Sequence, residues 1–227
     1  MHKDKEIIAA ESFWNEAYKG KKIELLCDGD YLVPKAMEPI FDVFTKECPT
    51  VLDFGCGAGD MLMSIAYTGR LKKGIGIENE ENIVSYARKM AEINGWSHLL
   101  CFIDGGMDAL KAMERGSFDG VVVSNVFDVI TKEVADEAME ELVRILKPNG
   151  LMLLKLNQSL TPEMYERLNM VNFRDNLYSK NGVLRGRECS TEEWRRWFDR
   201  HFKEEMYADV PWQRPDFFDR VFLLRKI

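Results

Sequence analysis

Residues 51–60 read VLDFGCGAGD, an apolar run that leads into three glycines within five positions. Glycine costs backbone entropy wherever the chain is ordered, so this density needs a structural reason. A buried strand over 50–54 that turns tightly into a helix over 59–69 would give one, because the turn brings free backbone N–H groups to the start of the helix. The stretch therefore predicts a strand–loop–helix unit that approaches a ligand. A tight turn that binds nothing is the alternative.

The same pattern continues as short apolar runs that alternate with amphipathic segments. Apolar runs without polar alternation are typical of strands covered on both faces, as in a parallel sheet. Strands separated by helices form right-handed crossover units, and a series of such units gives a doubly wound α/β sheet with helices on both faces. The expected elements are a strand over 73–78, a helix over 80–96, strands over 98–104 and 118–126, a helix from 131 that Pro148 ends, and a strand over 150–157.

The C-terminal region departs from this alternation. Ser190 and Glu193 have the spacing of a capping box at the start of a helix. Two candidate strands follow that helix, EEMYADV and FFDRVFLLRK, and the linker PWQRPD between them is too short for a crossover helix, so we expect them to be antiparallel. The apolar stripe of the helix would consist of Trp194, Trp197, Phe198 and either His201 or Phe202.

Carboxylates surround the glycine loop. Asp53 precedes it and Asp60 opens the helix after it, and both would repel a phosphate. The spacing is G-x-G-x-G, whereas a dinucleotide fingerprint is G-x-G-x-x-G. Glu78 ends the next strand, 21 residues beyond Gly57, where a carboxylate can accept hydrogen bonds from both hydroxyls of a ribose. The pattern favours a ligand with a ribose and a positively charged end, and S-adenosylmethionine has both.

Five segments in order resemble the motifs of the class I S-adenosylmethionine-dependent methyltransferases. They are VLDFGCGAGD, GIGIEN, FIDGGMDAL, FDGVVVSNV and LVRILKPNGLMLLKL, which cover residues 50–157. FWNEAYKG, near the N-terminus, resembles the opening helix of small-molecule methyltransferases of this family, where it caps the cofactor. The resemblance implies a Rossmann-like, mostly parallel sheet of seven strands in the order 3-2-1-4-5-7-6, with strand 7 antiparallel.

The resemblance also implies cofactor contacts. Glu78 would bind the ribose, Asp104 the adenine amino group and the backbone N–H of Gly105 the adenine ring, although Asp104 could simply begin a turn. Cys56 is interpreted as a small filler beside the ligand and not as a reactive thiol. The expected cofactor-binding residues are Trp14, Tyr18, Asp53, Gly55, Cys56, Gly57, Gly59, Glu78, Asn79, Asp104, Gly105, Ser124 and Asn125.

The resemblance divides the chain into regions. Residues 1–49, with helices at about 4–19 and 35–47, are expected to lie over the sheet and cap the cofactor, and 50–227 to form the methyltransferase domain. On the first helix Phe13, Trp14 and Tyr18 share one face, which could be a packing stripe or a lid that places aromatic rings against the sulfonium.

The segment 157–189 is a candidate substrate lid within this domain. Its residues LYSKNGVLRGRE, 177–188, predict a hairpin around an Asn-Gly turn. A contact between two copies of the chain is an equally good interpretation of the hairpin.

The loop SNVFDV, residues 124–129, is expected on the reaction side. It lacks the N/D-P-P-Y motif of amino-methylating DNA and protein enzymes, and neither His98 nor His201 is an obvious base. Asp128 is the weak catalytic candidate, because it could accept a substrate proton or bind an amine; a capping or solvated role is the alternative. A missing base does not argue against methyl transfer, since the cofactor itself carries the electrophile and the leaving group.

A run of arginines follows the hairpin. It could meet an acidic substrate, but the acidic residues interspersed with it favour a solvated face. Its members are Arg185, Arg187, Arg195, Arg196 and Arg200.

Composition limits the remaining function classes. The net charge of −7 argues against a nucleic-acid surface, and no apolar run approaches the length of a membrane span. The five cysteines include no C-x-x-C pair, so we expect reduced thiols in a cytoplasmic protein and no metal site. The expected partner is a small-molecule methyl acceptor, with the chain acting as a monomer or a homodimer.

Three other functions stay open at this stage. The chain could methylate a protein or an RNA, as the arginine-rich tail suggests. It could bind the cofactor as a regulatory module without turnover, since no base is identifiable. It could be a nicotinamide-dependent oxidoreductase, because Glu78 also suits that cofactor's ribose, although Asp53 and the glycine spacing weigh against it.

Overall fold

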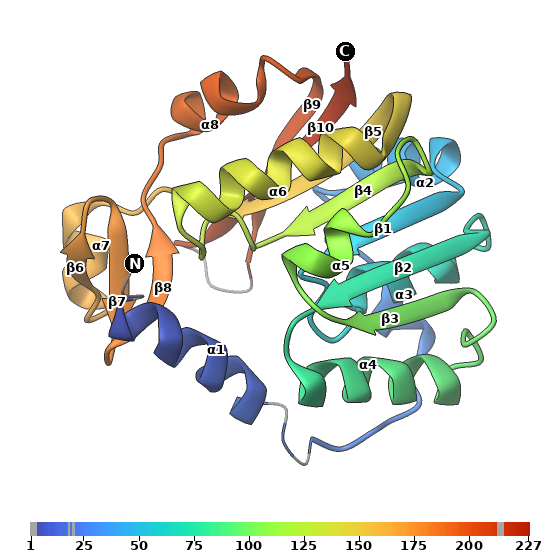
Figure 1. The fold of residues 1–227 in the computed structure, drawn as a ribbon, viewed down its shortest axis with the longest axis horizontal. Coiled ribbons are helices and arrows are strands. Elements are labelled where there is room, and N and C mark those ends of the chain that lie inside the picture. Colours follow the sequence, from blue (N-terminus) through green and yellow to red (C-terminus); the bar gives the residue numbers. More distant parts are fainter. Residues whose placement is uncertain (1–3, 18, 20, 213–215) are drawn as a thin grey trace.

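The computed structural model describes residues 4–17, 19, 21–212 and 216–227, and a seven-stranded sheet forms its centre (Figure 1). Its strands are β1 Thr50–Phe54, β2 Lys73–Glu78, β3 Leu100–Asp104, β4 Phe118–Ser124, β5 Leu146–Asn157, β9 Phe202–Pro211 and β10 Phe218–Lys226. They lie in the order β3-β2-β1-β4-β5-β10-β9. Only the pairs that include β10 are antiparallel. The predicted sheet, its strand order and its antiparallel last strand are confirmed.

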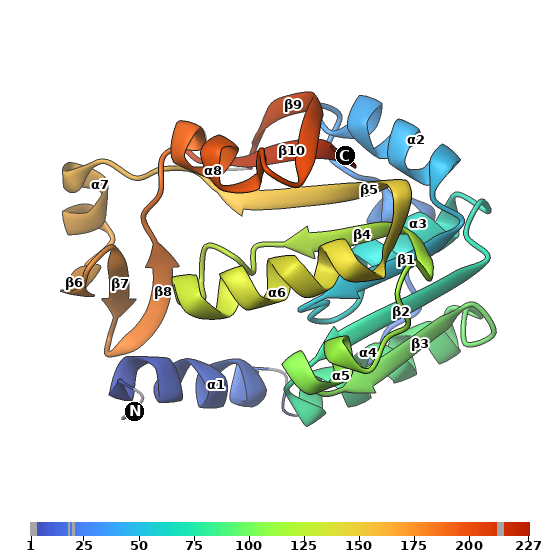
Figure 2. The same ribbon diagram turned by 45° about the horizontal axis from the view of Figure 1, so that its top comes forward.

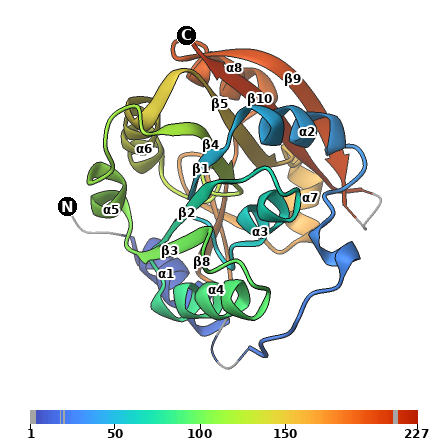
Figure 3. The ribbon, with the colours of Figure 1, turned by 90° about the vertical axis from the view of Figure 1, so that its right-hand side faces the viewer.

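Helices cover both faces of the sheet. One face carries α2 Glu38–Glu47, α3 Asp60–Tyr67 and α4 Glu81–Ile93, and the other carries α5 Met107–Lys111, α6 Lys132–Ile145 and α8 Thr191–Phe198 (Figure 3). Each layer forms its own apolar cluster with the sheet. The expected stripe of α8 is confirmed at Trp194 and Phe198, which are buried, and Trp197 is half-buried. The buried side chains of α4 include Ile83, Ala87 and Met90.

The helix from residue 132 ends earlier than Pro148. It ends at Ile145, and β5 begins at Leu146 and not at Gly150. The residue before a proline avoids the helical region, so the chain turns extended before Pro148 is reached. Its register with β4 then shifts between Phe118 and Gly120.

A second, three-stranded sheet stands beyond the carboxyl ends of the parallel strands (Figure 2). It consists of β6 Val171–Arg174, β7 Leu177–Lys180 and β8 Val183–Arg187, and it follows the short helix α7 Pro162–Arg167. The predicted hairpin is confirmed, because β7 and β8 are antiparallel around Asn181 and Gly182, whose φ angles are 53° and 74°. The sequence analysis missed β6, a strand of four residues with no buried side chain.

The two N-terminal helices have different positions. α2 packs on β4, β5 and β10, and its Ile40 and Phe44 are in the core. α1, Lys5–Ala17, contacts β8 and α4 instead, so the expectation that it lies over the sheet is wrong. An ion pair of 2.7 Å between Asp4 and Arg174 of β6 helps to hold it there. A short 3-10 helix, η1 Asp28–Tyr31, lies between α1 and α2.

Candidate active site

The glycine loop joins β1 to α3, and its three glycines all have positive φ angles. At Gly59 a Cβ atom would lie 2.6 Å from Cζ of Phe102, so packing alone requires glycine there. At Gly57, where φ is 52°, a Cβ atom would meet nothing within 4 Å. The open space beside Gly57 leaves its backbone accessible to a ligand.

Three acidic residues at successive strand ends, Asp53, Glu78 and Asp104, form what we call the carboxylate edge. Asp53 of β1 is 1% exposed, and its Oδ1 has no hydrogen-bond partner among the described residues. Oε2 of Glu78 accepts a hydrogen bond of 3.0 Å from the N–H of Gly57, and β2 pairs Glu78 with Asp104 of β3. The structure therefore gathers the three residues on one side of the molecule.

Burial and like charge govern the electrostatics of this edge. Burial raises the pKa of Asp53 to about 8, and the neighbouring carboxylates of Glu78 and Asp60 add to the shift. Burial also raises the pKa of Glu78, although hydrogen bonds from Gly57 and Asn79 oppose it. A buried carboxyl group surrounded by other carboxylates gains most from a cationic ligand.

The other residues expected around this edge differ in their surroundings. Cys56 is buried in the loop, and burial raises the pKa of its thiol well above the usual range, which agrees with a filler role. The N–H of Gly105 donates to the carbonyl of Glu78 at 2.9 Å. This N–H was expected to bind adenine, but it is already engaged within the sheet. Asn79 donates its N–H to Oε1 of Glu78 at 2.9 Å. Tyr18 lies outside the described residues.

Ser124 and Asn125 end β4, away from β2 and β3. Asn125 has a φ of 55°, and its N–H donates to the carbonyl of Lys155 at 2.8 Å. Its Nδ2 donates to Oδ1 of Asp219 at 3.4 Å. Asn125 therefore connects the end of β4 to β5 and β10 and borders the cavity described next.

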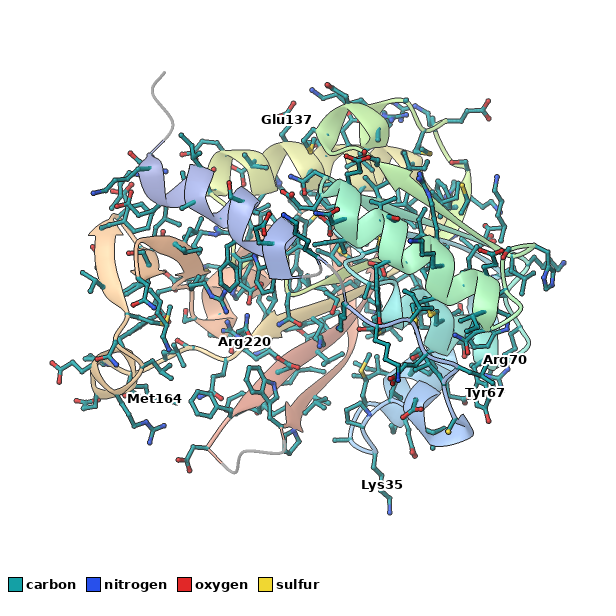
Figure 4. All side chains as sticks on the ribbon, turned by 90° about the horizontal axis from the view of Figure 1, so that it is seen from below. Lys35, Tyr67, Arg70, Glu137, Met164 and Arg220 are labelled. Carbon is teal, nitrogen blue, oxygen red and sulfur yellow. The ribbon has the colours of Figure 1, made fainter. Side chains whose placement is uncertain are left out.

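A cavity of about 540 Å³, which we call the acceptor cavity, lies at the carboxyl ends of β4 and β5. No residue of the carboxylate edge lines it, but Lys155, which does, is close enough to Asp53 to act on its pKa. Its walls come from α1, the β4–α6 loop, the ends of β5 and β10, and the small sheet. Figure 4 shows one of its residues, Arg220, well inside the outline of the molecule. The lining residues are Trp14, Asn125, Asp128, Val129, Lys155, Asn157, Gln158, Leu160, Tyr165, Leu168, Met170, Lys180, Leu184, Arg185, Gly186, Arg187, Glu188, Trp212, Phe217, Phe218, Asp219 and Arg220.

Asp128 belongs to this cavity, and neither a capping nor a solvated role fits it. Its side chain is 3% exposed, and its Oδ2 accepts hydrogen bonds from the backbone N–H and the side-chain amide of Asn157. Its Oδ1 has no partner among the described residues. Burial raises its pKa, while the positive charge of Arg220 opposes the shift. Asp128 anchors the β4–α6 loop to the end of β5.

The arginine run divides into two groups. Arg187 is buried, so a solvated face is wrong for it: its Nε and Nη2 donate to the carbonyl of Phe127 at 3.1 and 2.8 Å. Arg195 pairs with Glu204 at 2.9 Å on the surface of α8, where the solvated interpretation holds. Arg195 also pairs at 2.6 Å with Glu192, its acidic neighbour in sequence, whereas Arg187 has no ion pair with a described residue.

Phe13 and Trp14 do not form a core stripe on α1. Their side chains stay 43% and 39% exposed, and both rings lie against the guanidinium of Arg185, with its Cζ 4.7 and 4.9 Å from the ring centroids. This contact joins α1 to β8 at the wall of the acceptor cavity. Whether Trp14 also covers a cofactor stays a prediction.

The sequence analysis missed Arg220 as a residue of the site. It lies within β10 and is 2% exposed; its Nε donates to the carbonyl of Asn157 and its Nη1 to that of Cys189, both at 2.9 Å. The charged residues Asp219 and Arg220 between the apolar residues FF and VFLL were the available signal, because a buried charge requires partners.

Two features are absent from the described part of the chain. It contains no group of three or more side chains that could together ligate a metal ion. None of its helices has both the length and the apolar character that crossing a membrane requires.

A family model described as a methyltransferase domain matches residues 51–150. The match covers less than half of the chain, and the strand order of the sheet agrees with it. The chain carries a class I S-adenosylmethionine-dependent methyltransferase domain. The glycine loop and the carboxylate edge lie in this domain, whereas most of the acceptor cavity lies outside the matched range.

Curated relatives of this methyltransferase domain act on different substrates. A tRNA N(3)-methylcytidine methyltransferase of Schizosaccharomyces pombe is 22% identical over 81% of this chain and 60% of its own length. A ribosomal protein L11 methyltransferase of Desulfotalea psychrophila is 29% identical over 50% of this chain and 43% of its own length. The chain thus matches less than two thirds of either relative.

A solved structure supports the fold over the whole chain. It is a 1,6-didemethyltoxoflavin N1-methyltransferase of Burkholderia thailandensis, with bound 1,6-didemethyltoxoflavin and S-adenosylhomocysteine. The two chains superpose with a TM-score of 0.71 at 17% identity, over 100% of this chain and 91% of the other. At this identity the likeness concerns the fold alone.

Proposed function

We propose that the chain transfers a methyl group from S-adenosylmethionine to a small-molecule acceptor. The supporting observation is the acceptor cavity of about 540 Å³ at the carboxyl ends of β4 and β5, on the same side of the sheet as the carboxylate edge. Cavities of about 300–1,000 Å³ suit ligands of the size of a drug or metabolite. A folded macromolecule would have to insert an extended segment or a single flipped base instead.

The carboxylate edge fits the cofactor. Asp53 has a buried oxygen without a partner, which an ammonium group would satisfy, and the open space at Gly57 admits close approach. Glu78 would accept from the ribose hydroxyls, and Asp104 lies one strand further along for the adenine amino group. When bound, S-adenosylmethionine supplies the methyl group and the leaving thioether.

The chain's own residues would position the acceptor and exclude water. Trp14 and the small sheet cover the acceptor cavity, which favours the alignment that methyl transfer needs. Asp128 lines the same cavity with a carboxyl group whose pKa burial raises. It would hold the acceptor's N–H or O–H group and accept its proton when the acceptor has one to lose.

A macromolecular acceptor is the second candidate. The tRNA N(3)-methylcytidine methyltransferase favours it, because that relative aligns with 81% of this chain. The net charge of −7 weighs against it, because binding a phosphate backbone depends on clustered basic residues. A regulatory module that binds the cofactor without turnover is the third.

The test is methyl transfer to a cell extract. The protein is incubated with S-adenosylmethionine that carries a labelled methyl group and with extract, and products are separated by size and by nuclease or protease treatment. We expect the label in the small-molecule fraction, and clearly less of it with Glu78→Ala at the same concentration of S-adenosylmethionine. Label in RNA or protein would contradict the small-molecule acceptor. Binding of the cofactor without any transfer would favour the regulatory module.

A further inference from the structure

The acceptor cavity has an excess of positive charge in a chain whose net charge is −7. The described residues that line it include five basic side chains, Lys155, Lys180, Arg185, Arg187 and Arg220. They include three acidic ones, Asp128, Glu188 and Asp219. The excess therefore belongs to this cavity and not to the composition of the protein.

The three acidic residues compensate three of the basic ones. Lys155 pairs with Asp219 at 3.2 Å. Arg220 lies close enough to Asp128 and Glu188 for both to oppose the effect of burial on its pKa. Asp128 acts on Arg187 in the same way.

Arg185 and Lys180 are the two basic residues that remain. Among the residues whose side chains the structure describes, neither has an ion pair with a carboxylate. Arg185 is partly buried, and burial lowers its pKa with no described carboxylate opposing the shift. A desolvated cation without a counter-charge is unfavourable unless a ligand supplies one.

The backbone of β8 places Arg185 at an irregularity. Leu184 pairs with Ser179 and Gly186 pairs with Tyr178, so Arg185 is an extra residue opposite no partner on β7. Such a bulge redirects a side chain, and bulges are frequent beside active sites. Here both Leu184 and Arg185 line the acceptor cavity, although side chains of neighbouring strand residues normally point to opposite faces.

Aromatic rings hold Arg185 in place. Phe13 and Trp14 of α1 cover its guanidinium, and their contact supplies packing without neutralising its charge. The guanidinium of Arg185 makes no hydrogen bond with a described residue, so its N–H groups stay available. The apolar part of the cavity includes Trp212 and Phe217, whose rings stack with centroids 5.7 Å apart.

We propose that the acceptor is an organic acid, whose carboxylate binds Arg185 with Lys180 as a second positive charge. This rests on the proposed function and names the class of its substrate. The planar guanidinium matches a carboxylate with two parallel hydrogen bonds. Trp212 and Phe217 would pack against the apolar body of the acid, so an aromatic or otherwise flat acid suits the cavity best.

The test compares acids with their neutral amides on protein loaded with S-adenosylhomocysteine. Equilibrium dialysis measures the binding of 4-hydroxybenzoate against 4-hydroxybenzamide and of indole-3-acetate against indole-3-acetamide. We expect at least one acid to bind about tenfold or more tightly than its amide, because the amide loses the charge-assisted bonds. Arg185→Gln should abolish this preference and Arg185→Lys should keep part of it. Arg195→Gln, on the surface of α8, should leave it unchanged.

Calorimetry with S-adenosylhomocysteine separates this proposal from the proposed function. All three variants should bind it as the unaltered protein does, which shows that they are folded. If it binds but no acid is preferred over its amide, or if Arg185→Gln keeps the preference, the organic-acid proposal is wrong and the methyltransferase function stands. If the unaltered protein does not bind it, both are wrong.

Discussion

The carboxylate edge and the acceptor cavity are neighbours, yet they are built from opposite charges. At the edge, Asp53 lies beside Glu78 and Asp60, and its pKa is raised to about 8. In the cavity, basic residues outnumber acidic ones and Arg185 has no carboxylate partner among the described side chains. Lys155 connects the two regions. It lines the cavity, and its positive charge opposes the rise in the pKa of Asp53.

The opposite charges of the edge and the cavity would allow one site to distinguish two ligands. The edge disfavours anions and leaves a buried carboxyl oxygen for a cation, whereas the cavity does the reverse. A sulfonium-bearing nucleoside and an organic acid would therefore each be repelled from the other's place. Electrostatic selection of this kind acts through repulsion as well as attraction.

Arg220 and Arg185 both line the cavity but are expected to have different roles. Arg220 stabilises the fold, and Arg185 binds a ligand. Arg220→Ala should lower the free energy of unfolding by about 3 kcal/mol, because it removes the charged hydrogen bonds to the carbonyls of Asn157 and Cys189 and the positive charge near buried Asp128. Arg185→Ala removes no hydrogen bond and should cost less than about 1 kcal/mol. Urea unfolding at pH 7 measures both. Equal losses would contradict the assignment of Arg185 to a ligand.

Gly57 tests whether the open space in the loop holds a ligand. Gly57→Ala should weaken S-adenosylhomocysteine binding at least about tenfold, because the new methyl group would occupy that space. Gly69→Ala is the matched control: Gly69 also has a positive φ, of 71°, and its Cβ atom would meet nothing within 4 Å. Both changes should cost about 1–2 kcal/mol of stability. If calorimetry finds similar affinity in the two variants, the space beside Gly57 is not the cofactor site.

Asp53→Asn should stabilise the cofactor-free protein, which is the opposite sign to Arg220→Ala. In the unfolded chain Asp53 ionises near pH 4, whereas in the fold it stays protonated up to about pH 8. Between these values the native state holds a proton that the unfolded state has released, so Asp53 lowers stability as pH rises through the window.

The expected gain from Asp53→Asn is at least about 1 kcal/mol at pH 8 and close to zero at pH 4. Thermal unfolding at both pH values measures it. A variant that is less stable than the unaltered protein at pH 8 would show that the carboxylate has an internal partner.

The two regions also differ in how far the sequence predicts them. The strand order followed from the family resemblance that five short motifs carry. The gathering of Asp53, Glu78 and Asp104 followed from their places at strand ends, because the carboxyl ends of parallel strands meet at one edge. The acceptor cavity combines residues from Trp14 to Arg220, and no local pattern connects them.

Particular residues show why the rest was out of reach. From the sequence, a capping or solvated role was the alternative for Asp128. Its carboxylate is instead buried and bonded to Asn157, 29 residues away, a contact that no local pattern indicates. Arg187 stands among acidic residues, yet its partner is the carbonyl of Phe127. The bulge at Arg185 depends on the register of β7 against β8, which the hairpin prediction did not specify.

The central claim is that the carboxylate edge binds the nucleoside of S-adenosylmethionine. Isothermal calorimetry with S-adenosylhomocysteine tests it, comparing the unaltered protein with Glu78→Ala and with Glu92→Ala, an exposed residue of α4. We predict clear binding to the unaltered protein and to Glu92→Ala, and a loss of about 1–3 kcal/mol in Glu78→Ala from the missing charged hydrogen bonds. Equal binding by all three proteins, or no binding to the folded unaltered chain, would contradict the claim.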